Sequence, residues 1–155
     1  MYDPVLGGRI FYLSARTFAE MSRLLGETIS REAAHALLWN IGQRYGLSLG
    51  GKVKRMTSNN DEAIKLLTAT GLKSGWGKPR ISDKLDTDNM IELIMENCVF
   101  CEGLASMGGS QCYFLAGILN GIAESLLGKR FQTRETECRA SGGTGCRFII
   151  ESVQE

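Results

Sequence analysis

The N-terminal half of the chain carries apolar side chains three and four positions apart, which is the period of an α-helix. This spacing predicts a helix capped by Ser14 and ending before Gly26, and a longer helix from about Ser30 to Gly46. The β-prone run at 9–13 predicts a short strand ahead of both helices. The longer helix is the main candidate for the core.

A polar segment at 47–60 follows the second predicted helix. It is rich in Gly, Ser and Lys, a composition that is typical of a loop. Asn59 and Glu62 have the spacing of a capping box, which predicts a third helix that ends near Gly71. We expect this loop to connect helices within a single domain over residues 1–155, because 155 residues match one domain of ordinary size.

Beyond Gly71 the pattern changes to that of β-strands. Residues 75–82 predict an extended segment, 83–89 predict a polar turn, and 90–96 predict a strand in which apolar and polar side chains alternate. Together these three segments indicate an antiparallel hairpin.

The C-terminal part predicts one buried helix and a second hairpin. Residues 111–127 are apolar around much of a helical circumference, with Ser110 as the predicted cap and Gly128 beyond the end. The strand-like runs 131–139 and 147–153 are separated by a Gly-rich turn. The sequence therefore predicts an α+β fold in which helices pack on an antiparallel sheet.

Composition and charge exclude several classes of protein. With 43% hydrophobic and 23% charged residues, the chain is not expected to be disordered or fibrous. A net charge of +1 gives no field that would draw nucleic acid or an anionic membrane, so we expect no direct binding of nucleic acid. The longest apolar stretch, at 112–119, is shorter than the ~18 residues typical of a membrane-spanning helix. The N-terminus lacks a basic start that leads into an apolar run, so we expect a cytoplasmic protein whose five cysteines are thiols.

Four residues in the C-terminal half form the strongest candidate site: Cys112, Glu135, Cys138 and Cys146. Cys138 and Cys146 flank the turn of the second hairpin. Cys112 lies at the start of the long helix, where the helix dipole favours a thiolate. Three thiolates and one carboxylate suit a four-coordinate structural Zn²⁺. Because Glu135 and Cys138 face opposite sides of a regular strand, their convergence requires a bulge or the end of the strand. The alternative is three unconnected buried thiols.

A second pair of cysteines, Cys98 and Cys101, has the spacing of a zinc-knuckle or redox motif. The pair continues a predicted strand, in which positions three apart point to opposite faces. We therefore expect packing, or a role at the strand's end, rather than joint metal or thiol chemistry.

Large aromatic side chains are the candidates for a ligand pocket: Trp39, Trp76, Phe100, Phe114 and Phe131. Core packing is the alternative, because periodicity does not distinguish a filled interior from a cavity. Gly117 and Gly121 give the long helix a flat side, which admits a neighbouring helix or leaves room for a ligand. His35 is the only histidine, and no Ser or Cys near it in sequence completes a nucleophilic arrangement, so no catalytic residue is predicted.

The C-terminal half resembles the 4-vinyl-reductase-like domain family over about residues 71–150. The resemblance rests on the run Cys112–Gly121, on the spacing between Glu135 and Cys138, and on Gly145–Phe148. The family includes small stand-alone proteins and the sensory domains of aromatic-responsive transcription activators. Its fold is similar to that of transport-particle subunits of vesicle trafficking.

For the sensory members, the resemblance implies a dimeric α+β domain with an apolar pocket for phenol-like molecules beside a structural zinc. The zinc ligands fall on Cys112, Glu135, Cys138 and Cys146 of this chain. The resemblance implies non-enzymatic binding or sensing of a small hydrophobic or aromatic molecule, by a homodimer that signals through a regulatory protein partner. Two alternatives stay open: a reductase or accessory factor that acts on a tetrapyrrole vinyl group, and a protein-interaction scaffold.

Overall fold

Helices occupy the first half of the chain and strands most of the second. The computed structural model describes residues 2–3, 8–84 and 89–153, and all that follows concerns these residues. The α-helices are α1 (Ala15–Ile29), α2 (Arg31–Met56), α3 (Asn60–Lys73) and α5 (Tyr113–Leu127). The strands are β1 (Tyr2–Asp3), β2 (Gly8–Arg9), β3 (Lys78–Lys84), β4 (Met90–Glu96), β5 (Phe131–Glu137) and β6 (Cys146–Ser152). Short 3₁₀ helices lie at η1 (Val99–Cys101), η2 (Ala105–Met107) and η3 (Arg139–Ser141).

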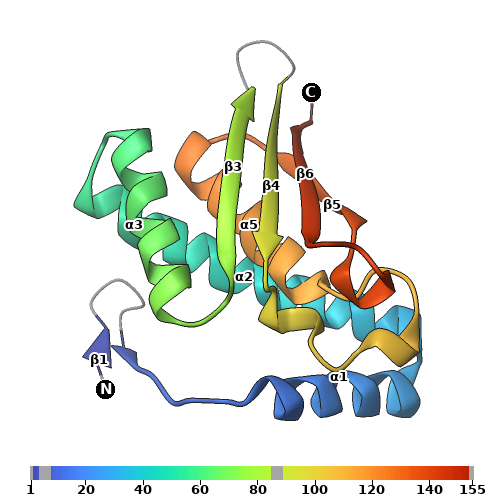
Figure 1. Cartoon of the computed structure of the whole chain (residues 1–155). Helices are drawn as coiled ribbons and strands as arrows, with labels where there is room; N and C mark the ends of the chain where they lie inside the picture. The colour runs from blue at the N-terminus through green and yellow to red at the C-terminus, as the bar shows by residue number, and fades with distance from the viewer. Residues whose placement is uncertain (1, 4–7, 85–88, 154–155) are drawn as a thin grey trace.

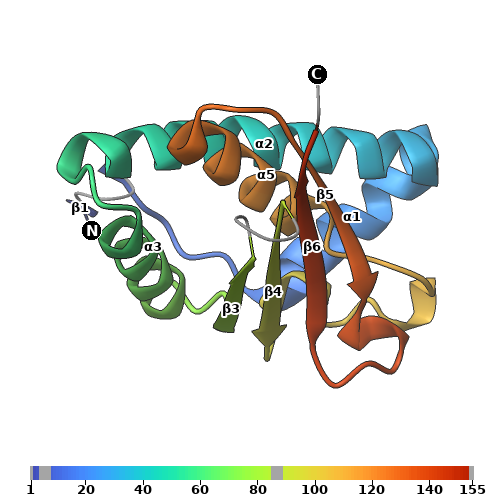
Figure 2. The same ribbon diagram turned by 90° about the horizontal axis from the view of Figure 1, so that it is seen from above.

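The four long strands form one antiparallel sheet in the order β3-β4-β6-β5. Helix α5 lies between this sheet and the long helix α2, as the two views in Figure 1 and Figure 2 show. Helix α3 lies beside β3, and α1 runs along α2 and η1. The predicted α+β fold with an antiparallel sheet is therefore confirmed.

Both predicted hairpins are present, and a third pairing joins them. Strands β3 and β4 pair with Arg80 opposite Ile94, and β5 and β6 pair with Thr133 opposite Ile150. Strand β4 then pairs with β6, which joins the two hairpins into one sheet. Of the predicted turn at 83–89, positions 85–88 lie outside the described residues.

Several predicted helix ends are confirmed by their hydrogen bonds. The backbone N–H of Thr17 donates to Ser14 Oγ at 3.1 Å, and the backbone N–H of Glu62 donates to Asn59 Oδ1 at 3.1 Å. Gly128 follows α5 with a φ of +69°, the left-handed conformation that glycine adopts without strain.

The start of α5 differs from the prediction. Cys112, rather than Ser110, is the residue that caps this helix, and it makes no side-chain capping bond. The thiol of Cys112 is completely buried and faces other sulfurs, so the first turn of the helix is built around a sulfur atom instead of a hydroxyl.

The predicted helix ends at Gly26 and Gly46 are wrong. Helix α1 continues to Ile29 and α2 to Met56, so most of the predicted loop at 47–60 is helical. Gly46 is a glycine because of helix packing: a Cβ at this position would lie 2.2 Å from the carbonyl oxygen of Ile118. This glycine allows another helix to approach rather than ending its own.

The strand predicted at 9–13 is also wrong beyond Arg9. Only Gly8–Arg9 forms a strand, paired with β1. Phe11 and Tyr12 are 83% and 79% exposed, so their β-propensity has no sheet surface to pack on.

Gly46 and three further glycines bring the backbones of α2 and α5 into direct contact. A Cβ at Gly42 would lie 2.1 Å from the carbonyl oxygen of Phe114, and one at Gly117 would lie 2.1 Å from that of Trp39. Gly121 meets α2 in the same way. The flat side predicted on the long helix therefore admits a neighbouring helix.

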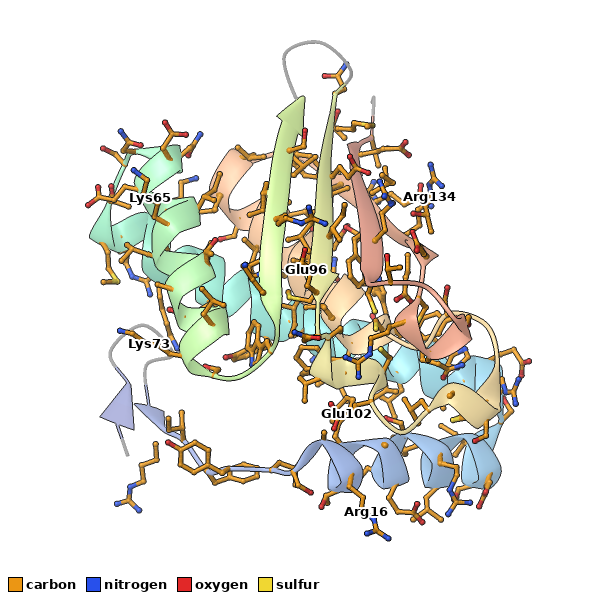
Figure 3. The ribbon with its side chains drawn as sticks, in the orientation of Figure 1. Arg16, Lys65, Lys73, Glu96, Glu102 and Arg134 are labelled. Carbon is orange, nitrogen blue, oxygen red and sulfur yellow. The ribbon has the colours of Figure 1, made fainter. Side chains whose placement is uncertain are left out.

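Charged side chains lie on the outside of this assembly. Figure 3 shows Arg16 on α1 and Lys65 and Lys73 on α3 pointing away from the body of the molecule. Among the described residues, none of the helices combines the length and the apolar character needed to cross a bilayer.

The glycine contact gives a test of the helix pairing. We expect Gly46→Ala to lower the free energy of unfolding by about 3 kcal/mol, because the new methyl group overlaps a backbone oxygen that moves only if α2 and α5 separate. Urea denaturation followed by circular dichroism measures this change.

Gly51→Ala on the same helix is the matched control. A Cβ at Gly51 meets its nearest atom, Ser125 Oγ, at 3.6 Å, which is ordinary contact. We expect this variant to be neutral or stabilised by about 0.5–1 kcal/mol through helix propensity. Equal effects of the two substitutions would contradict the proposed packing role of Gly46.

Candidate functional site

Five buried cysteines from separate parts of the chain converge at the start of α5. Cys112 caps α5, Cys138 directly follows β5, and Cys146 is the first residue of β6. Cys98 and Cys101 lie at the two ends of the 3₁₀ turn η1, just after β4. The cluster therefore joins the sheet, the central helix and the η1 turn.

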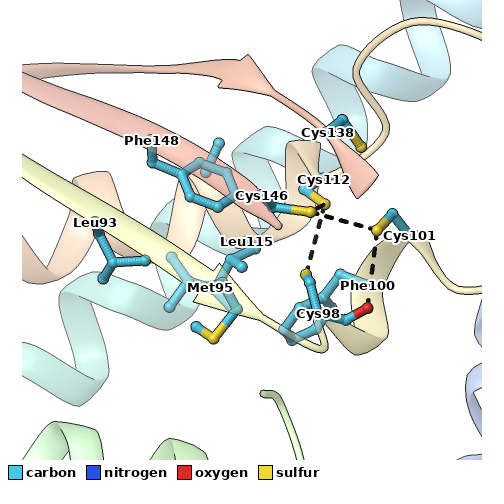
Figure 4. Close-up of a cluster of buried hydrophobic side chains, with 12 residues drawn as sticks. Leu93, Met95, Cys98, Phe100, Cys101, Cys112, Leu115, Cys138, Cys146 and Phe148 are labelled. Atoms are coloured by element: carbon cyan, nitrogen blue, oxygen red, sulfur yellow. Dashed lines mark hydrogen bonds between the residues drawn. The ribbon is translucent and has the colours of Figure 1, made fainter. Parts of the chain in front are cut away.

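Four of the sulfurs are in direct contact (Figure 4). Cys112 Sγ lies 3.6 Å from Cys98 Sγ and 3.6 Å from Cys146 Sγ, and Cys101 Sγ lies 3.4 Å from Cys146 Sγ. The thiols of Cys101 and Cys112 also interact. Hydrogen bonding between them lowers the pKa of Cys101 and raises the pKa of Cys112.

The predicted set of Cys112, Glu135, Cys138 and Cys146 comes together. One ligand atom from each of the four residues lies within 4.8 Å of all the others. The sequence required a bulge or a strand end for this, and both are present: the register between β5 and β6 shifts between Glu135 and Glu137, and β5 ends at Glu137.

The carboxylate of Glu135 is only half satisfied. Its Oε2 accepts a hydrogen bond from the backbone N–H of Cys112 at 3.1 Å. Its Oε1 is buried and, within the described part of the chain, has no hydrogen-bond partner. Burial raises the pKa of this carboxyl group, although the Cys112 N–H opposes that effect. A buried oxygen without a partner, on a carboxylate that lies beside thiols, fits a position in which a cation is bound.

The donor atoms of this set suit a divalent metal ion. Thiolate sulfur and carboxylate oxygen are both zinc ligands, and four donors fill a tetrahedral shell. A filled shell leaves no position for water or substrate, so an ion held here would have a structural role.

Cys98 and Cys101 are placed differently from the prediction. Strand β4 ends at Glu96, Asn97 adopts a φ of +52°, and the chain turns into η1. The expectation that the two side chains point to opposite faces of a strand is therefore wrong. With Cys112 and Cys146 they form a second group of four sulfurs within 4.8 Å of one another.

Two arginines flank the cluster. The backbone N–H of Arg139 donates to Cys146 Sγ at 3.4 Å, and its guanidinium group lies 3.7 Å from a carboxylate oxygen of Glu102. The guanidinium group of Arg147 pairs with Glu137 at 3.6 Å. Both guanidinium groups are thus paired with carboxylates, and the backbone N–H of Arg139 is the group that contacts a sulfur.

An apolar cavity of about 150 Å³ lies between α3, α5 and the sheet. Asn60 and Thr68 are the lining residues that carry an amide or a hydroxyl group, and Asn60 is largely exposed. The lining comprises Asn60, Ile64, Leu67, Thr68 and Gly71 of α3, Trp76, the strand residues Pro79, Ile81, Ile91, Leu93, Met95 and Ile150, and Leu115, Leu119, Ile122, Ala123, Leu126 and Leu127 of α5.

The five aromatic residues considered for a pocket have different positions. Trp76 lines the cavity. Phe100 packs edge-on against Trp76, with ring centroids 5.7 Å apart, and Phe114 packs against Phe100 at 5.6 Å. Trp39 packs against the core that contains the cysteines, and Phe131 belongs to a second core cluster. The structure therefore brings three of the five together, and one of them reaches the cavity.

The aliphatic lining of the cavity was missed by the sequence analysis. Ile64, Leu67 and Gly71 recur at helical spacing on α3, and this spacing is the signal that could have indicated a lining face. The same spacing is equally typical of a filled core. The position of α3 relative to the sheet decides between the two.

His35 packs against an aromatic side chain. Its ring stacks on Tyr113 with centroids 3.9 Å apart and an interplanar angle of 14°. Partial burial lowers the pKa of this histidine, and the nearby positive charge of Arg31 lowers it further by a smaller amount.

The C-terminal part of the chain is similar in sequence to a known domain. Residues 91–152 match the vinyl-4-reductase (V-4-R) domain. The uncharacterized protein MJ0150 of Methanocaldococcus jannaschii is 26% identical over 116 residues, which cover 75% of this chain and 64% of that protein. The chain thus spans less than two thirds of the length of this relative.

Solved structures share the fold at low sequence identity. The phenol-responsive sensory domain of the transcription activator PoxR, solved with phenol, has a TM-score of 0.81 and 18% identity, covering 94% of this chain and 78% of that chain. A vinyl-4-reductase family protein of M. jannaschii has a TM-score of 0.67 and 19% identity, covering 94% and 85%. A trafficking protein particle complex subunit 3 of Naegleria fowleri, covalently bound to palmitic acid, has a TM-score of 0.68 and 12% identity, covering 90% and 93%.

These matches agree with the resemblance identified from the cysteine, glycine and glutamate spacings. Residues 91–152 match the vinyl-4-reductase domain, and the chain shares its fold with a phenol-responsive sensory domain and with a trafficking-complex subunit.

Proposed function

We propose that this protein binds a small apolar or aromatic molecule without catalysis, and that the bound state is signalled through a protein partner. The observation that carries the proposal is the cavity between α3, α5 and the sheet, whose lining is almost entirely aliphatic and aromatic. An apolar cavity of about 150 Å³ is large enough for benzene. The match to the vinyl-4-reductase domain and the fold shared with a phenol-responsive sensory domain support small-molecule sensing.

The lining chemistry indicates the class of ligand. An O–H group buried without a partner costs roughly 1–3 kcal/mol, and the lining offers little beyond Thr68 to receive one. We therefore infer that an aromatic hydrocarbon binds more tightly than its hydroxylated counterpart.

We further propose that Zn²⁺ is held by Cys112, Glu135, Cys138 and Cys146. The orphaned Oε1 of Glu135 and the convergence of the four donors support this ion. When bound, it supplies a crosslink between the start of α5 and the final hairpin. Such an ion can contribute about 10 kcal/mol of apparent binding energy, comparable to the whole stability of a domain of this size.

A homodimer is part of the proposal. Helices α1 and α2 carry large apolar side chains that are 40–50% exposed, namely Met21, Leu24, Ile29, Leu37 and Ile41. A second copy of the chain would remove this apolar surface from water.

Ligand binding is tested with toluene and phenol. We expect toluene to raise the melting temperature, by about 2–4 °C for each kcal/mol of binding free energy, and phenol to raise it less. Ala123→Leu fills the cavity and should abolish the shift, because Ala123 lines it from α5. Differential scanning calorimetry measures the shift.

Ala36→Leu is the matched control, since it adds the same side chain at an exposed position of α2. We expect it to keep the full toluene shift. The binding proposal fails if the Ala123 and Ala36 variants respond to toluene alike.

The zinc proposal is tested by elemental analysis and melting of protein purified without chelator. We expect Cys138→Ser and Cys146→Ser to lower both the zinc content and the melting temperature, because each removes one ligand from the crosslink. Thr144→Ala, on the exposed connection between the two cysteines, should change neither. Unchanged melting in both cysteine variants would count against the ion.

The homodimer is tested by size-exclusion chromatography with light scattering. We expect twice the chain mass for the wild type and a single chain for the double variant Leu24→Glu/Ile41→Glu, because the carboxylates would lose their hydration at the interface. Gln132→Glu/Thr136→Glu places the same charges on exposed positions of β5 and should stay dimeric. A wild-type mass of one chain rules out the dimer.

A further inference from the structure

Two cysteines are not used by the proposed zinc site, although they touch it. Cys98 Sγ lies 3.6 Å from Cys112 Sγ, and Cys101 Sγ lies 3.4 Å from Cys146 Sγ. Both are buried, at 0% and 2% exposure, so neither thiol faces solvent. Each unused sulfur thus contacts a sulfur that belongs to the proposed set.

The geometry of these sulfurs is that of a metal shell. Four ligands placed tetrahedrally around Zn²⁺ at about 2.3 Å stand about 3.8 Å from one another. The three close contacts among Cys98, Cys101, Cys112 and Cys146 are 3.4–3.6 Å, and all four sulfurs lie within 4.8 Å of one another. Small shifts of the side chains are enough to place one ion among them.

One ion alone leaves part of the cluster unused. An ion held by the four sulfurs has a filled shell and leaves Glu135, whose Oε1 is buried without a partner among the described residues, without a ligand role. An ion held by the set with Glu135 leaves Cys98 and Cys101 without a ligand role. Two independent observations, the orphaned oxygen and the contacting sulfurs, therefore point to two positions.

We propose that the cluster binds two divalent metal ions of the zinc type, with the thiolates of Cys112 and Cys146 bridging them. This inference rests on the zinc ion proposed above and adds a second. Each ion then has four donors, although the cluster has only six: Cys98, Cys101, Cys112, Glu135, Cys138 and Cys146. In Figure 4 the shared sulfurs of Cys112 and Cys146 lie between Cys138 on one side and Cys98 and Cys101 on the other.

The charge balance permits the shared arrangement. Five thiolates and one carboxylate carry −6, and two divalent ions reduce this to −2, the same charge that one ion with four thiolates would carry. Each metal–sulfur bond forms as a thiol releases its proton to solvent, so no oxidant or reductant is required. The backbone N–H groups of Cys112 and Arg139 donate to Glu135 and to Cys146 Sγ, respectively, and the N-terminus of α5 adds partial positive charge.

The test counts metal ions per chain. The full chain is reduced, loaded with Zn²⁺ under anaerobic conditions and desalted, and its zinc content is measured by elemental analysis and native mass spectrometry. We expect two ions in the wild type and one in Cys98→Ser/Cys101→Ser. The matched variant Glu135→Gln/Cys138→Ser removes the other pair of donors and should also retain one.

One ion in the wild type overturns the two-ion proposal, and the variants then separate the two sites. If Cys98→Ser/Cys101→Ser still holds one ion, the zinc site of the proposed function stands alone. If it holds none and Glu135→Gln/Cys138→Ser holds one, the ion belongs to the four sulfurs. An absence of bound zinc in the wild type overturns both proposals.

A titration with Co²⁺ tests the bridge in the wild type, without any variant. We expect thiolate charge-transfer absorption to rise up to two equivalents. The paramagnetic resonance signal should reach its maximum near one equivalent and fall toward two, because bridged ions couple magnetically. A signal that rises linearly to two equivalents would show separate ions and overturn the shared thiolates.

Discussion

Helix α5 lies so close to α2 that the carbonyl oxygens of Trp39 and Ile118 occupy the space where side chains at Gly117 and Gly46 would begin. This contact fixes the position of α5 by backbone atoms, which adjust far less than side chains do. One end of α5 then supplies the thiol of Cys112 to the cysteine cluster, and its sheet-facing side supplies much of the cavity lining. Both sites depend on a helix whose position is set by glycine.

The sequence predicted those parts of the fold that depend on local chemistry. The caps at Ser14 and Asn59 and the left-handed end at Gly128 are short-range hydrogen-bonding and backbone effects, and both hairpins follow from alternation and turn residues. Gly46 was misassigned because a glycine that ends a helix and one that admits a neighbour look alike in sequence. The distinction needs the partner helix, which lies far along the chain at Ile118.

The candidate site divides in the same manner. The spacing of Glu135, Cys138 and Cys146 identified residues that do come together, and it also identified the strand irregularity on which their convergence depends. Cys98 and Cys101 were predicted to continue a strand, but this strand ends at Glu96. The turn that follows brings both sulfurs into the same cluster. The cavity was not predictable from periodicity, because an unfilled interior and a filled one have the same apolar pattern.

Trp76 connects the cavity with the cysteine cluster. Its indole lines the cavity and meets the edge of Phe100, while its carbonyl oxygen accepts the backbone N–H of Val99 at 3.1 Å, within the same short turn that presents Cys98 and Cys101. A ligand that displaced the Trp76 ring would therefore also disturb the η1 turn, which carries Cys98 and Cys101. Thermodynamic linkage would make such an effect reciprocal: if a ligand in the cavity strengthened metal binding by the proposed site, the metal would strengthen binding of the ligand by the same factor.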